Sequence, residues 1–174
     1  HRHQISLNFP EPVLAEVQKI LDQTSKDIPL YPQDNDLTFL HPLPIDSEYT
    51  RDIDDALSIE PLGGGQYRVG VHISDVATFL ETEKEIFQEA MGRATSIYLP
   101  DQRIPMISPA LSEGICSLIV GEKRRALSIL IKMDLEARVQ EYQGVPSLIQ
   151  VDRRLSYDQA DQLLDEGDEE VNTL

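Results

Sequence analysis

The pattern that most restricts the possible folds is an alternation of apolar and polar residues on both sides of three consecutive glycines. Residues 56–60 alternate as a half-buried strand does, residues 61–65 read as a turn, and residues 66–73 return as a second strand. No Lys-Ser or Lys-Thr pair follows the glycines, and no helix is expected to open there. A β-hairpin loop is therefore favoured over a phosphate-binding loop.

A second hairpin is predicted further along the chain, from residues 125–133 and 139–151. Apolar residues at helical spacing predict a helix over 13–21, and a Thr-x-x-Glu capping box at residues 82–85 predicts another that ends near Arg93. A third helix is expected to begin at Tyr157. The predicted fold class is α+β, with a mixed, largely antiparallel sheet and flanking helices.

Composition allows one domain of ordinary size or a piece of a larger protein, since the chain has 174 residues and 40% apolar content. No apolar run has the length of a membrane span, and the single cysteine, Cys116, excludes an intrachain disulfide. We therefore expect no membrane association and a cytoplasmic location. The formal charge of −16 argues against a nucleic-acid partner, but many of the acids lie in residues 161–170 and in one further cluster.

That further cluster lies in residues 45–58, which contain four closely spaced aspartates: Asp46, Asp52, Asp54 and Asp55. Carboxylates packed so closely repel one another, so a bound cation is their natural counterion. Oxygen ligands of this kind suit Mg²⁺ or Mn²⁺ better than zinc or copper.

The acidic cluster has two other interpretations. An EF-hand is excluded, because Ala56 and Leu57 stand where that loop needs another ligand and a glycine. A solvated surface cluster remains open, although Ile53 between two acids indicates a chain that is entering a buried element. In a regular strand Asp52 and Asp54 would share one face and Asp55 the other, so convergence requires an irregular backbone near Asp54.

Three ordered motifs resemble one known family. The acidic stretch 46–58, the strand with its terminating Asp at 69–76, and the block at 93–100 with its continuation to residue 118 are similar to the ribonuclease II and ribonuclease R exoribonucleases. The resemblance covers residues 36–160, in the RNB-type catalytic domain of that family. It implies that residues 1–35 are a linker and helix leading into the domain and that residues 36–174 are its N-terminal part.

The resemblance also implies an activity and its cofactor. Members of the family remove nucleotides processively from the 3′ end of single-stranded RNA and release nucleoside 5′-monophosphates, with Mg²⁺ or with Mn²⁺ in its place. Two metal ions can activate the attacking water and stabilise the leaving oxygen. By resemblance, Asp46 and Asp55 hold the more tightly bound ion, while Asp52 and Asp54 serve the second ion and orient the water.

Two tyrosines are implicated as RNA-binding residues by the same resemblance. Tyr98 is expected to stack on a base near the 3′ end, although a core tyrosine on a short strand is the plain alternative. Tyr157 is expected near the RNA. The family's catalytic domain extends beyond this chain and is usually flanked by OB-type RNA-binding domains, so the isolated chain is expected to be inactive. The alternative function is a catalytically inactive RNA-binding or scaffold relative with the same fold.

Overall fold

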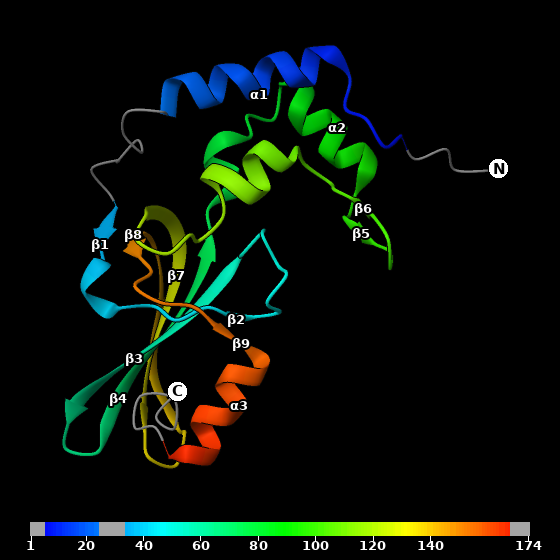
Figure 1. Ribbon diagram of the computed structural model, residues 1–174. Helices are drawn as coiled ribbons and strands as arrows, with labels where there is room; N and C mark the ends of the chain where they lie inside the picture. Colours follow the sequence, from blue (N-terminus) through cyan, green and yellow to red (C-terminus); the bar gives the residue numbers. More distant parts are fainter. Residues whose placement is uncertain (1–5, 25–33, 168–174) are drawn as a thin grey trace.

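The computed structural model of the protein describes residues 6–24 and 34–167, and is built around one five-stranded sheet (Figure 1). The strand order is β1-β8-β7-β4-β3; only β1 pairs in parallel with its neighbour β8, and the remaining pairs are antiparallel. This is the predicted mixed, largely antiparallel sheet. The strands are β1 (Asn35–Asp36), β3 (Asp55–Gly63), β4 (Gln66–Ser74), β7 (Lys123–Asp134) and β8 (Val139–Gln150).

Both predicted hairpins are present in the sheet. β3 and β4 pair in register from Asp55 with Ile73, and their turn contains three glycines that all have positive φ. Glycine adopts this conformation without the steric cost that other residues would meet. The triple glycine therefore serves a tight turn and is not a phosphate-binding loop.

One face of the sheet carries the main core. Ala56, Ala126, Leu130 and Ile149 on this face pack against Leu37 and Leu40, beside the short helix η1 (Thr38–Leu40), and against Ile53 and Leu118. The opposite face exposes aliphatic side chains, among them Leu127, which is 52% exposed. The alternation of side chains along the strands thus gives the sheet one buried face, and Ile53 packs against that face.

A helical cluster covers one end of the sheet, at the top of Figure 1. It consists of α1 (Glu11–Thr24), η2 (Val76–Phe79), α2 (Glu85–Arg93) and the single-turn η3 (Leu111–Ile115), whose buried and partly buried apolar side chains form a second core. Leu111 and Cys116 are buried in it, so the cysteine packs as a small apolar group. Because α1 packs within this cluster, it is integrated with the rest of the chain; the predicted division at residues 35 and 36 stays a prediction.

The predicted capping box of α2 is wrong. The N-cap residue is Lys84, without a side-chain cap, and the carboxylate of Glu16 in α1 accepts the hydrogen bond of the Ile86 amide at 3.0 Å. The helix start is thus stabilised from a neighbouring helix instead of from its own sequence. A capping box does occur at α3, where Ser156 and Gln159 exchange hydrogen bonds.

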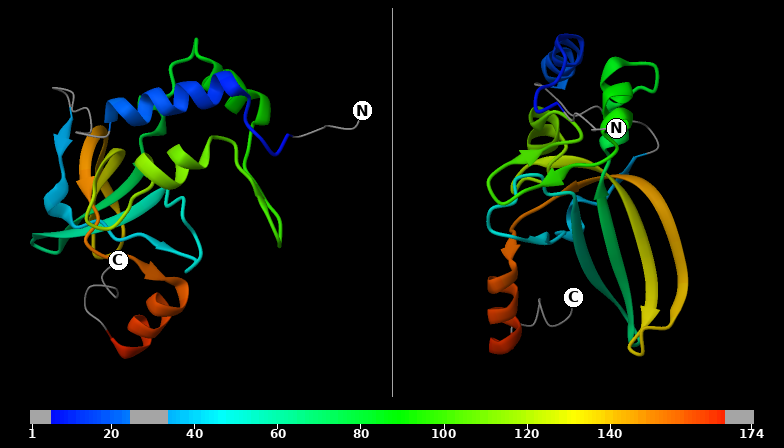
Figure 2. Two further views of the ribbon diagram at one scale, coloured as in Figure 1. Left: turned by 45° about the horizontal axis from the view of Figure 1, so that its top comes forward. Right: turned by 90° about the vertical axis from the view of Figure 1, so that its right-hand side faces the viewer.

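The remaining elements form two small units that Figure 2 shows from two further directions. The predicted third helix is α3 (Tyr157–Glu166), which packs through Ala160 on the parallel pair β2 (Ile45–Asp46) and β9 (Leu155–Ser156). β5 (Ile97–Tyr98) and β6 (Arg103–Ile104) form a short antiparallel hairpin. No helix in the described ranges is long and apolar enough to cross a membrane.

Candidate active site

The four aspartates lie on and around one short loop. Asp46 ends β2, Asp52 and Asp54 lie in the connection that has no regular secondary structure, and Asp55 begins β3. The predicted departure from strand geometry near Asp54 is therefore confirmed. Asp54 and Asp55 are exposed, while the Ile53 side chain between them and Asp52 is buried in the sheet core.

The loop is fixed on one side by Ser117, a residue that the sequence reasoning did not identify. Its fully buried hydroxyl donates to the Arg51 carbonyl at 2.8 Å and accepts from the Ile53 amide at 3.0 Å. The neighbouring Leu118 amide donates to the Ile53 carbonyl at 3.0 Å. The backbone on both sides of Asp52 is thus held by residues that follow η3.

The loop is fixed on its other side by Arg154, just before β9. Its guanidinium donates to the Thr50 carbonyl at 2.9 Å and to the Ser47 carbonyl. Within this turn, one oxygen of Asp46 accepts from the Ser47 amide at 2.6 Å and from the Thr50 hydroxyl at 2.8 Å. One planar side chain therefore stabilises the turn between Asp46 and Asp52.

The four acids act on one another electrostatically. The pKa of Asp54 is raised, first by partial desolvation of its carboxylate and then by the negative charges of Asp52, Asp55 and Asp46, with Arg103 opposing the shift. Excess negative charge on carboxylate oxygens fits a hard divalent cation such as Mg²⁺ or Mn²⁺. The kind of donor and the sign of the field therefore suit the predicted metal.

The arrangement is nevertheless not a closed cage. Within residues 6–24 and 34–167, no three acidic, histidine or cysteine side chains are placed so that they could hold one metal ion together. The structure thus gathers the four aspartates in one region without bringing their oxygens to a common point. Metal ligation by these four residues stays a prediction.

The carboxylate of Asp52 is turned toward the β5–β6 hairpin. Its Oδ1 lies 2.6 Å from Nη1 of Arg103, and its Oδ2 accepts a hydrogen bond from the Tyr98 hydroxyl at 2.9 Å. Tyr98 and Arg103 are paired across the hairpin, with the guanidinium 6.0 Å from the centre of the ring. Partial burial, followed by the hydrogen bond to Asp52, raises the pKa of Tyr98.

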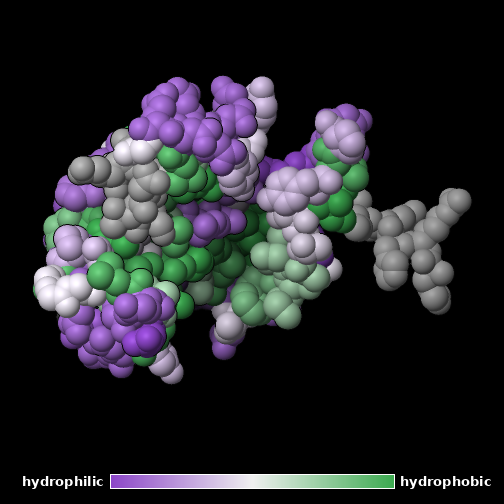
Figure 3. All heavy atoms as spheres, turned by 90° about the horizontal axis from the view of Figure 1, so that it is seen from below, coloured by the Kyte–Doolittle hydropathy of each residue, from purple (hydrophilic) through white to green (hydrophobic). Residues whose placement is uncertain are grey.

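Tyr98 is not a core residue, because its side chain is 65% exposed. It borders an open groove of about 650 Å³ that is also lined by Tyr49, Asp52, Arg103 and Glu113. Figure 3 shows a hollow in the surface between the sheet and the part of the molecule that carries β5 and β6. The alternative of a buried structural tyrosine is therefore wrong.

Tyr157 has a different place. It is the first residue of α3, it is exposed, and it follows Ser156, which is the strand partner of Asp46. It therefore lies beside the β2 end of the acidic loop and away from the β5–β6 side of the groove. Its contact with RNA stays a prediction.

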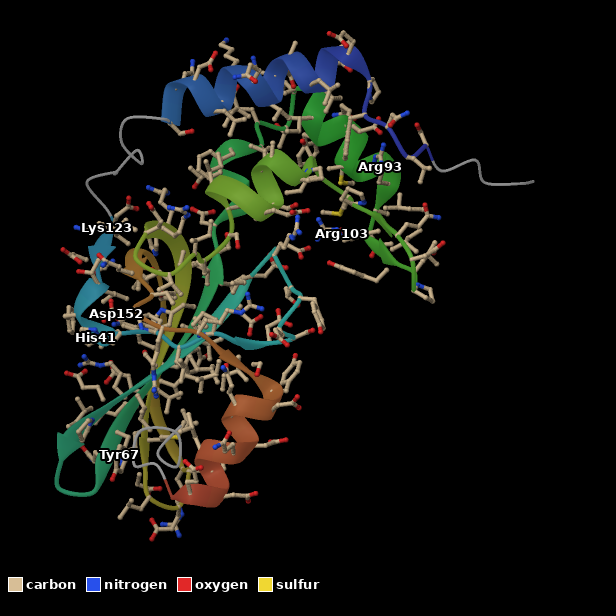
Figure 4. The ribbon with its side chains drawn as sticks, viewed as in Figure 1. His41, Tyr67, Arg93, Arg103, Lys123 and Asp152 are labelled. Atoms are coloured by element: carbon tan, nitrogen blue, oxygen red, sulfur yellow. The ribbon has the colours of Figure 1, made fainter. Side chains whose placement is uncertain are left out.

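Arg93 and Arg103, both labelled in Figure 4, have separate roles. Arg93 at the end of α2 bonds to Glu89, to the Asn8 and Pro105 carbonyls and lies 4.0 Å from the centre of the Phe9 ring, so it is structural. Arg103 extends from β6 toward the acidic loop, where it bonds to Asp52 and Glu113.

Comparison with known proteins identifies the family. The sequence model described as the RNB domain matches residues 34–173. Over 158 residues the chain is 37% identical to ribonuclease R of Thermotoga maritima, covering 91% of this chain and 22% of that protein. It is 42% identical over 130 residues to DIS3-like exonuclease 2 of Arabidopsis thaliana, covering 75% of this chain and 12% of that protein.

Solved structures agree with this assignment. Mycoplasma genitalium RNase R in complex with ribose-methylated single-stranded RNA has a TM-score of 0.76 and 26% identity, with 94% of this chain and 28% of that chain covered. Yeast Ssd1, described as a pseudonuclease, shares the fold at 19% identity and a TM-score of 0.74, with 97% and 24% covered. The chain spans about a fifth of the length of the ribonuclease R relatives, and it belongs to the RNB-domain family of ribonucleases.

Proposed function

We propose that the protein carrying this chain is a hydrolytic, metal-dependent exoribonuclease that degrades single-stranded RNA processively from its 3′ end and releases nucleoside 5′-monophosphates. The single observation that carries the proposal is the acidic loop, which keeps four aspartates beside a groove with an exposed tyrosine. Family membership supports the same reaction class.

The four aspartates would have different roles in the reaction. Asp46 and Asp55, at the two ends of the loop, would hold one divalent ion, while Asp52 and Asp54 would hold a second and orient the attacking water. When bound, Mg²⁺ or Mn²⁺ supplies a more acidic water and a counter-charge for the leaving oxygen. Ser117 and Arg154 hold the backbone of the loop from which these carboxylates extend.

Tyr98 would hold the end of the RNA. Its exposed ring borders the groove and its hydroxyl donates a hydrogen bond to Asp52, so a base stacked on the ring would lie next to the acids. Stacking tolerates any base, and this suits an enzyme that moves along an RNA of any sequence.

The decisive test is Asp54→Asn in the full-length protein. We expect turnover of 5′-labelled single-stranded RNA to fall by several orders of magnitude with RNA affinity nearly retained, because the amide keeps the size of the side chain but loses its charge. Asp161→Asn on α3 makes the same chemical change away from the groove and should leave turnover near the parental value. Undiminished turnover in Asp54→Asn would refute the proposal.

An inactive RNA-binding relative is the second candidate. It is favoured by one observation: a relative of equal identity, 42%, is named an inactive exonuclease in Arabidopsis thaliana. The labelled-RNA assay with Mg²⁺ separates the two functions. A ladder that ends in a short oligonucleotide supports the exoribonuclease, and RNA that is bound but undegraded supports the inactive relative.

A further inference from the structure

Both oxygens of Asp52 are engaged by the β5–β6 hairpin. Arg103 contacts Oδ1 at 2.6 Å and Tyr98 donates to Oδ2 at 2.9 Å. A guanidinium in direct contact with a carboxylate competes with a metal ion for the same lone pairs and the same negative charge. In the described structure, Asp52 is therefore paired with an arginine and is not free to ligate a cation.

Arg103 has a second carboxylate partner that also lines the groove. It also pairs with Glu113 of η3, and Glu113 lies 3.8 Å from Arg51. The Arg103 side chain keeps one carboxylate partner if it leaves Asp52, so the guanidinium is not left unpaired. The side chain borders the groove itself, where an incoming ligand reaches it.

We propose that Arg103 is a positioning residue that neutralises Asp52 while the groove is empty and transfers to a phosphate of the RNA when the groove is filled. Asp52 is then released to a divalent cation. RNA and the metal thus bind with positive coupling at this site. The inference rests on the proposed function, since it takes RNA and a divalent cation as the ligands.

The chemistry of the partners favours this exchange. A guanidinium forms paired hydrogen bonds with a phosphate as readily as with a carboxylate, so the arginine loses little by changing partner. Asp52, once exposed to the charges of Asp54 and the other acids, then attracts a cation more strongly. Coupling between two ligands is reciprocal, so the metal must also raise the affinity for RNA by the same factor.

The test measures Mn²⁺ affinity of the full-length protein by the loss of the free Mn²⁺ electron paramagnetic resonance signal, with and without a ribose-methylated single-stranded oligonucleotide. In the parental protein we expect the oligonucleotide to lower the Kd for Mn²⁺ at least about tenfold. In Arg103→Gln, Mn²⁺ should bind without RNA about as tightly as it binds the parental protein with RNA. The oligonucleotide should then change the affinity less than about threefold.

Arg51→Gln is the matched control, because it removes the same charge from the same groove, and Arg51 contacts Glu113 instead of Asp52. It should keep most of the coupling. Glu113→Gln should have the opposite effect on Mn²⁺ affinity to Arg103→Gln. Arg103 loses its second carboxylate partner and pairs more firmly with Asp52, so Mn²⁺ should bind more weakly without RNA. An oligonucleotide with uncharged methylphosphonate linkages should not tighten Mn²⁺ binding in the parental protein.

Two results would overturn the inference while leaving the proposed function intact. One is a parental protein that degrades RNA with Mn²⁺ but whose Mn²⁺ affinity is unaffected by the oligonucleotide. The other is a folded Arg103→Gln variant with the full parental coupling. A parental protein that neither binds Mn²⁺ nor degrades RNA refutes the proposed function, and this inference with it.

Discussion

Ser117 governs the position of Asp52 without touching its carboxylate. One buried hydroxyl bonds to the Arg51 carbonyl and to the Ile53 amide, so the two peptide groups that flank Asp52 are fixed by a single side chain. A buried amide that loses its acceptor costs free energy and tends to move toward water. Small displacements of a catalytic carboxylate have large effects on rate.

We expect Ser117→Ala to reduce turnover at least about tenfold while RNA affinity changes little. The loop keeps all of its carboxylates, but the backbone around Asp52 is no longer held in position. The free energy of unfolding should fall by about 1–3 kcal/mol. Urea denaturation and single-turnover kinetics measure the two effects. The control is Ser58→Ala, which removes a buried hydroxyl from the sheet instead, and should lower stability without lowering turnover per folded molecule.

Tyr98 offers two separable functions, one in its hydroxyl and one in its ring. Tyr98→Phe removes the bond to Asp52 and keeps the stacking surface, so we expect the final product length to be unchanged. Tyr98→Leu should weaken RNA binding by about 1–3 kcal/mol and change the length of the shortest product. Denaturing gels of 5′-labelled RNA report this directly. Equal behaviour of the two variants would contradict a stacking role.

At the scale of elements, the sheet contains a buried polar chain across four strands. His72 of β4 bonds to Ser58 of β3 at 2.8 Å and to Ser128 of β7 at 2.7 Å, and Ser128 bonds to Ser147 of β8 at 2.6 Å. Gly70 makes room for it, because a Cβ there would lie 2.5 Å from Nε2 of His72. The chain satisfies polar groups inside the core and specifies the register of the strands.

This polar chain predicts a pH dependence of stability. Burial lowers the pKa of His72 from 6.5 to about 4, so between these values the unfolded state binds more protons than the folded state. The contribution of this residue is complete above pH 6.5 and is lost as the pH falls toward 4, by about 3 kcal/mol in the limit. Urea denaturation at pH 7.5, 5.5 and 4.5 measures the loss, and His72→Gln should remove this part of it.

The sequence predicted those elements whose signals are local. The two hairpins, the helices and the irregular backbone near Asp54 follow from alternation, glycine and the spacing of the acids. The pairing of β2 with β9 and the capping of α2 by Glu16 depend on residues far apart in the chain, so no local pattern shows them. Ser117 escaped notice as a site residue for the same reason, because its partners Arg51 and Ile53 lie more than 60 residues away in the chain.

At the scale of the whole molecule, charge limits what this chain does alone. The formal charge is −16, and within the described ranges the groove is lined by only two basic residues, Arg51 and Arg103. RNA binding relies on neutralising phosphates with Lys and Arg, and this surface supplies few of them. Family relatives are several times longer than this chain.

We therefore expect the isolated 174-residue chain to bind single-stranded RNA weakly and to degrade none of it measurably with Mg²⁺. Fluorescence anisotropy and the labelled-RNA assay, each run beside the full-length protein, measure binding and activity. Circular dichroism shows whether the isolated chain is folded. Robust Mg²⁺-dependent degradation by a folded isolated chain would contradict the expectation.

The parallel pairing of β2 with β9 also sets an order of events during synthesis. Arg154 donates hydrogen bonds to carbonyls that precede it by 104 and 107 residues. The turn between Asp46 and Asp52 therefore lacks these hydrogen bonds until residue 154 has left the ribosome. By then the residues of β3, β4 and β7 have already been made and can pair. Contacts of such sequence separation form slowly, because a long loop must close first. Assembly of the acidic loop is thus a late step, and in a half-synthesised chain the four aspartates are not yet held in place by Arg154.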